Sequence, residues 1–177
     1  MEVVTARPGY ELWRPNREKA ESKMTKALIS LVLLVSAGLI VIVTLGGWER
    51  LQGGSVGVMS LTWAALYVLF AFLVARWNRG VLPVASALAV ILAIFAALSA
   101  PEWFERSKEG LDSPALPEDL IGLLTLLLVP VQALLIAVAM IGFNQEWHVE
   151  EERPIGGPLA GEGEGGASGG APQPQAG

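Results

Sequence analysis

The residues of this chain with the clearest chemical potential lie in the segment EWHVEEE, which contains its one histidine, His148, followed by glutamates at 150–152. Imidazole and carboxylate groups bind divalent metals, and together they can also act as an acid and base pair. A lone histidine among acidic residues in a polar segment is more commonly solvated, and we favour that interpretation. We therefore predict no metal site and no catalytic residues, and an enzyme acting at a membrane surface is the weakest hypothesis.

Several other kinds of chemistry are excluded by composition and motif. The chain has no cysteine, so disulfides, thiol nucleophiles, iron–sulfur clusters and thiolate metal sites cannot form. Its glycines follow no strand-and-helix pattern that would cradle a phosphate, and its basic residues form no groove for nucleic acid. We expect no bound cofactor and no nucleic-acid partner.

The most polar side chain within the apolar part of the sequence is Gln132, which follows Pro130 in the run LIGLLTLLLVPVQALLIAVAMIGF. Proline removes one helical hydrogen bond, so a kink is expected beside the glutamine. One interpretation is a ligand pocket or pathway formed by these two residues with Tyr67 and Trp63. The other, which we favour, is an interhelical hydrogen bond of about 1 kcal/mol or less. The possible partners are Ser36, Thr44, Thr62, Tyr67 and Ser86.

Gln132 and its possible partners lie within four uncharged runs of 19 to 24 residues each. At a rise of 1.5 Å per residue, a helix of this length crosses a hydrocarbon layer of about 30 Å. Charged residues make up 16% of the chain, against about 25% in soluble domains. The pattern predicts an all-α integral membrane protein, with four transmembrane helices in an antiparallel bundle. The expected spans are 27–45, 56–75, 81–100 and 120–143.

Small and aromatic residues suggest how the helices pack and where the membrane ends. Small side chains allow close approach of helices in lipid, and alanines recur every four residues in the third span. Tryptophans follow directly after apolar runs, as interfacial anchors do. The expected packing face is Ala85, Ala89, Ala93 and Ala97, and the expected anchors are Trp48, Trp77, Trp103 and Trp147.

The connections and ends complete the predicted organisation. Residues 1–26 form a polar cytoplasmic segment, and a tight turn makes the second and third spans neighbours. Ser99 and Glu102 have capping-box spacing, which predicts a short interfacial helix between the third and fourth spans. Residues 144–177 form a tail that is first acidic and then rich in glycine and proline, and we expect it to be disordered.

Basic residues predict the orientation in the membrane. With the N-terminus inside, the inner segments contain nine Lys and Arg residues and the outer loops three. The positive-inside rule therefore favours both termini in the cytoplasm, in a plasma (inner) membrane.

The four runs contain no Asp, Glu, Lys, Arg or His, which ion-coupled transporters and proton relays usually need. We expect a non-catalytic membrane protein, either an accessory or structural subunit of a larger assembly or a scaffold that associates with itself. Its partners would be the lipid bilayer and other membrane subunits or further copies. The alternative is a passive channel or carrier for a neutral or lipid-like molecule.

Overall fold

The computed structural model describes residues 8–51, 54–105 and 115–155 of the 177-residue chain. These residues belong to two units, one built from both ends of the chain and one that extends from Asn16 to His148.

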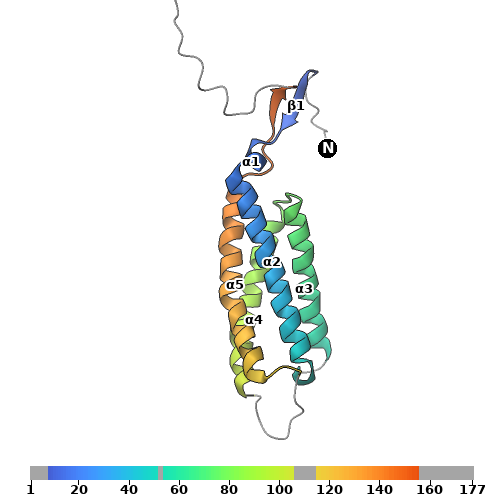
Figure 1. Ribbon diagram of the computed structural model, residues 1–177, viewed down its shortest axis with the longest axis vertical. Helices are drawn as coiled ribbons and strands as arrows, with labels where there is room; N and C mark the ends of the chain where they lie inside the picture. Colours follow the sequence, from blue (N-terminus) through green and yellow to red (C-terminus); the bar gives the residue numbers. More distant parts are fainter. Residues whose placement is uncertain (1–7, 52–53, 106–114, 156–177) are drawn as a thin grey trace, which may run out of the picture. The chain divides into compact units, whose positions relative to one another are not determined.

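The unit from Asn16 to His148 is mostly helical and contains four helices long and apolar enough to cross a membrane (Figure 1). Each includes one of the predicted runs and extends beyond it at one end or both. They are α2 (Ala20–Gly46), α3 (Gly54–Ala75), α4 (Val81–Glu105) and α5 (Glu118–Asn144). The short helix α1 (Pro15–Glu18) precedes them, and the 3-10 helix η1 (Trp48–Arg50) follows α2.

The long helices pack unevenly against one another. The contacts between α4 and α5 are the most extensive, and α2 packs against both α3 and α5, whereas α3 and α4 touch only sparsely despite their short connection. Gly142 marks one close approach, because a Cβ atom there would lie 2.7 Å from Cδ1 of Ile29 on α2 and 3.3 Å from Cδ1 of Leu82 on α4. The sparse contact between α3 and α4 leaves space between them at one end.

The core between the helices combines small and branched side chains, while large apolar side chains cover much of the outer surface. Leu33, Leu135 and Tyr67 are fully buried, whereas Phe72 and Leu98 are exposed. In water such a surface would be unfavourable, but lipid tails are as apolar as leucine.

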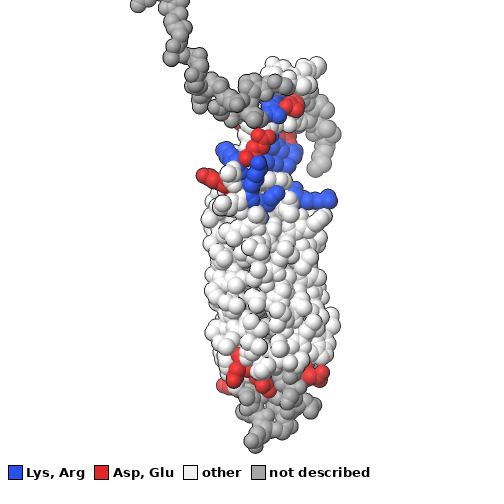
Figure 2. All heavy atoms as spheres, viewed as in Figure 1, with Lys and Arg blue, Asp and Glu red and all other residues white. Residues whose placement is uncertain are grey.

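Charge is distributed unequally along this unit (Figure 2). Lys and Arg side chains gather at the end where α2 begins, with some acidic side chains beside them, and Asp and Glu occur at the opposite end, with an uncharged zone between the two ends. The basic end includes Lys19, Lys23, Lys26, Arg76 and Arg79, and the acidic end includes Glu49, Glu102, Glu105, Glu118 and Asp119.

The predicted alanine face is shifted in the structure. Ala85 and Ala89 are fully buried, but Ala93 is half-buried and Ala97 is exposed. The buried line continues instead through Ala96 and Ala100. A four-residue step advances about 400° around a helix of 3.6 residues per turn, so a strict repeat of four drifts away from a fixed face.

The predicted interfacial helix after the third span is not a separate element within the described residues. Helix α4 continues through Pro101 to Glu105, and the Ser99 hydroxyl donates to the carbonyl of Phe95 instead of capping a new helix. Trp103 is buried at the end of α4, where its ring occupies the space that a Cβ on Gly47 would need. This packing keeps the chain helical beyond the apolar run. The remainder of the predicted segment, residues 106–114, lies outside the described residues.

Two of the four tryptophans expected to be interfacial anchors are instead buried in the protein. Trp103 and Trp147 are 3% and 0% exposed, while Trp48 is 39% exposed. Trp77 is half-buried in the α3–α4 turn, where its backbone is left-handed with φ of 65°. A position just beyond an apolar run therefore does not distinguish a lipid-facing tryptophan from one that packs against other helices.

The second unit contains a two-stranded antiparallel sheet that the sequence analysis missed. Strand β1 (Tyr10–Trp13) pairs with β2 (Glu151–Pro154), with Glu11 opposite Arg153. Arg153 Nε donates to Glu11 Oε1 at 2.6 Å, and Arg14 forms an ion pair with Glu150. The tail is therefore ordered at least as far as this strand, which corrects the expectation of disorder from residue 144. Residues 156–177 lie outside the described part.

Candidate functional site

The polar side chains at the centre of the helical unit form one chain of hydrogen bonds. The Tyr67 hydroxyl on α3 donates to Oε1 of Gln132 on α5 at 2.9 Å, and Gln132 Nε2 donates to Oγ of Ser36 on α2 at 3.0 Å. Ser36 in turn donates to the backbone carbonyl of Val32 at 2.8 Å. Tyr67, Gln132 and Ser36 are each 0% exposed. The glutamine thus links three helices, and both partners belong to the set named from the sequence.

The other two residues grouped with Gln132 lie elsewhere. Pro130 is on the exposed side of α5, which remains a continuous helix through it. Trp63 is half-buried on α3, one helical turn before Tyr67. Its indole N–H is buried and has no hydrogen-bond partner among the described residues. The structure therefore joins Tyr67 with Gln132, places Trp63 beside them and leaves Pro130 outside.

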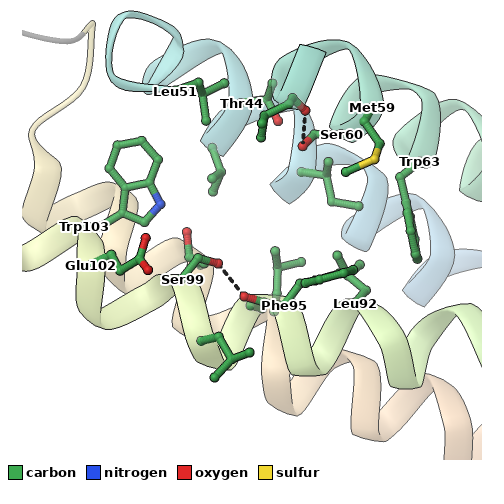
Figure 3. A pocket seen from close by; sticks show the side chains of 17 residues that line it. Thr44, Leu51, Met59, Ser60, Trp63, Leu92, Phe95, Ser99, Glu102 and Trp103 are labelled. Atoms are coloured by element: carbon green, nitrogen blue, oxygen red, sulfur yellow. Dashed lines mark hydrogen bonds between the residues drawn. The ribbon is translucent and has the colours of Figure 1, made fainter. Parts of the chain in front are cut away.

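A cavity of about 390 Å³ lies at the acidic end of the unit and receives side chains from all four long helices (Figure 3). This volume is within the range of about 300–1,000 Å³ found for small-molecule sites. Helices α3 and α4, which have little direct contact, contribute most of the lining. From α3 come Val56, Met59, Ser60 and Trp63, and from α4 come Leu92, Phe95, Ala96, Leu98, Ser99, Glu102 and Trp103.

The walls of the cavity are mainly apolar, and three of the four hydroxyl groups that line it donate hydrogen bonds within their own helices. Ser60 donates to the Val56 carbonyl at 2.9 Å and Thr125 to the Ile121 carbonyl at 2.8 Å, while Ser99 donates to Phe95. A hydroxyl that donates to its own helix still has a free lone pair. These three groups therefore face a ligand chiefly as hydrogen-bond acceptors.

The two ends of the cavity differ in polarity. Figure 3 shows Glu102 and Trp103 at one end and Trp63 with Leu92 at the other. Trp63 is noticeable from the sequence as a polar aromatic residue inside an apolar run, but the cavity is not, because its lining depends on which faces of four helices meet. The one available signal is a serine within each of the two apolar runs, Ser60 on α3 and Ser99 on α4, and such residues are too common to be diagnostic.

Aromatic and cationic side chains pack against one another at the basic end. Trp147 packs edge-on against Trp77 with 5.3 Å between ring centroids, and Lys26 Nζ lies 4.2 Å from the centroid of the Trp77 ring. Arg17 Nε donates to the Trp147 carbonyl at 2.9 Å. The Trp147 indole N–H donates to Oε1 of Gln145 at 3.0 Å. This cluster secures the segment after α5 to α1, α2 and the α3–α4 turn.

His148 lies in the same region with Arg79 as its neighbour. Nδ1 of His148 is 2.8 Å from Nη1 of Arg79, so the arginine donates to the imidazole nitrogen. Glu150 is instead paired with Arg14. Among the described residues no group of three or more His, Asp or Glu side chains is arranged to hold a metal ion.

Comparison with known proteins identifies no relative of this chain. No protein family model, curated protein or solved structure matches it, so function is argued from the geometry alone.

Proposed function

We propose that this chain is a non-catalytic integral membrane protein whose four long helices cross the membrane as an antiparallel bundle. Its role is that of an accessory or structural subunit, or of a scaffold that associates with itself. The observation that carries the proposal is the Ser36–Gln132–Tyr67 chain of hydrogen bonds. It engages the most polar side chain of the spans in holding helices together, so little polar surface remains for a conducting path.

The outer surface of α5 supports a role in association. Ala133 and Ala137 are both exposed and lie four residues apart on the side that also carries Pro130. Small residues at this spacing allow a second helix to approach closely in lipid. Because these alanines do not pack within the chain, a helix of a partner or of another copy is the contact that would use them.

Association can be tested in mild detergent, starting from a natural chain that lacks cysteine. We expect the full-length protein to purify as a defined oligomer or with a stoichiometric partner. Oxidation of the Ala137→Cys variant should give a disulfide-linked dimer if a second copy of the chain occupies this face. Val68→Cys, on the exposed face of α3, is the matched control and should remain uncoupled. An inert monomer with no partner would contradict the proposal.

We also propose that the basic end of the helical unit faces the cytoplasm of a cell bounded by an inner membrane. The nine-to-three bias of Lys and Arg supports this orientation. A membrane-impermeant maleimide should label Glu49→Cys on intact cells, whereas Lys19→Cys should react after permeabilisation. Both positions have exposed side chains, so a difference in labelling would report the side of the membrane on which each residue lies and not burial within the protein. The opposite labelling pattern would reverse the orientation.

The cavity between α3 and α4 favours a second candidate function, a carrier for a lipid-like molecule. It has the volume and the apolar lining of a ligand site, and none of Ser36, Tyr67 and Gln132 lines it. Under this alternative the bundle would take up a molecule from the membrane and not conduct one through its centre.

A further inference from the structure

We propose that the cavity at the acidic end binds one hydrocarbon chain of a membrane amphiphile whose headgroup is a primary amine. The chain would lie between α3 and α4, and the ammonium group would lie beside Glu102. This site stands independently of the accessory role, because it holds whether or not the protein has a partner. It deepens the second candidate by naming the class of molecule that would be carried.

The dimensions of the cavity fit a single chain. Its lining on α4 extends from Glu102 to Leu92, and ten residues of helix span about 15 Å. That is about half of a hydrocarbon layer of about 30 Å, which is the depth of one leaflet. The site is therefore as deep as one lipid chain, and at its deep end lie the side chain of Leu92 and the ring of Trp63.

The side chains along the cavity explain how a chain could enter. Helices α3 and α4 have few contacts with each other, so the cavity lies where the helical wall is least closed. Its lining residues Phe95 and Leu98 are 54% and 68% exposed on the outer surface of α4, and Met59 on α3 is 57% exposed. Entry from the side would therefore pass between apolar groups that already face lipid tails.

The polar groups determine the headgroup. Ser99 lies one turn before Glu102 on α4 and presents a lone pair, since its hydroxyl donates to the carbonyl of Phe95 (Figure 3). Glu102, at the end of the cavity nearest the end of α4, adds a carboxylate. A headgroup that donates hydrogen bonds and carries positive charge complements this lining, and the charge-assisted bond to a carboxylate is the stronger kind. An anionic headgroup would instead be repelled by Glu102.

The test uses the full-length protein in phosphatidylcholine vesicles and the probe ω-bromododecylamine, whose bromine quenches tryptophan fluorescence on contact. We expect quenching that saturates as the mole fraction of probe rises. Trp63→Phe should remove most of the saturable part, because Trp63 lies at the deep end where the chain terminus would sit. Glu102→Gln should weaken apparent affinity roughly tenfold. Glu105→Gln, an exposed acid three residues further on, should leave affinity unchanged.

Matched variants that fill the cavity separate binding from simple partition into lipid. The Ala96→Phe substitution places a phenyl ring in the cavity, whereas Ala97→Phe places the same ring on the exposed face of α4. Saturable quenching should be lost in the first and kept in the second. Ser60→Phe fills the cavity from α3 and decides the matter if Ala96→Phe does not fold, as judged by circular dichroism.

Three results would overturn the inference. Quenching that rises linearly without saturation, equally in Ala96→Phe and Ala97→Phe, would mean partition only. Equal saturation by ω-bromododecanol or ω-bromododecanoate would remove the requirement for an amine. If the Glu102→Gln variant bound the amine probe with full affinity, the assigned contact between the ammonium group and the Glu102 carboxylate would be wrong. None of these results would affect the oxidation test at Ala137, so failure here is distinguishable from failure of the accessory role.

Discussion

Replacing Trp147 by alanine is expected to lower the free energy of unfolding of the helical unit by about 3–5 kcal/mol, the usual loss when a buried aromatic side chain is truncated. Trp147 is the largest fully buried side chain among the described residues. Its ring packs against Trp77 and lies near the backbone of Gly142, while its N–H engages Gln145. Truncation would leave a cavity where α2, α5 and the α3–α4 turn meet. It would also remove the indole N–H that donates to the side-chain oxygen Oε1 of Gln145.

The measurement is unfolding in mixed micelles of increasing denaturing-detergent content, followed by far-ultraviolet circular dichroism. Trp147→Phe should lose less than Trp147→Ala, because it keeps most of the ring volume and gives up the indole N–H. Trp48→Ala is the control for loss of a tryptophan at the end of a helix, and its 39% exposure predicts a smaller effect. Equal stability of Trp147→Ala and the natural protein would mean that the segment after α5 is not docked.

The sequence predicts the four long apolar helices well because the signal is additive over about twenty residues. Each uncharged run is long enough to cross a membrane, and each lies within a helix of the structure. Such a run does not determine where its helix stops. Helix α4 continues to Glu105 because Trp103 finds a buried place against Gly47, and no local pattern reports that contact.

Contacts between distant segments account for the remaining differences. Strand β1 pairs with a partner more than 130 residues later, so the order of the early tail depends on a segment at the other end of the chain. The burial of the alanines on α4 also depends on contacts with other helices. Ala85 and Ala97 belong to the same repeat of four residues, but Ala85 is buried and Ala97 faces outward. The cavity is harder still to foresee, because it exists where α3 and α4 fail to pack closely.

The central hydrogen bonds were closer to being predictable, since polar side chains in lipid have few alternatives to one another. Gln132 is the most polar residue of the spans, and the sequence offered five partners for it. Two of them, Ser36 and Tyr67, are bonded to it in the structure, and Pro130 turns outward. Choosing among the five required the relative rotation of three helices, which periodicity alone does not determine.

Replacing Gln132 by leucine is expected to destabilise the helical unit by about 1–3 kcal/mol, because it leaves the buried hydroxyls of Tyr67 and Ser36 without their shared partner. A double-mutant cycle with Tyr67→Phe isolates the bond between the two side chains. Interhelical bonds in membranes average about 0.6 kcal/mol and reach about 1.7, so a coupling energy in that range is expected. Thr62→Val, on the exposed face of α3, should change stability by less than about 0.5 kcal/mol.

The same variant distinguishes the two functional hypotheses, because Gln132 is the polar group that a path through the bundle would have to use. If the residue holds helices together, Gln132→Leu lowers stability while leaving association at Ala137 and amine binding beside Glu102 intact under folding conditions. If it lines a path, reconstituted flux of a neutral solute falls in a variant whose fold is retained. Loss of flux at unchanged stability would therefore replace the accessory role by a channel, since a structural role predicts a loss of stability when Gln132 is removed and its buried partners are left unsatisfied.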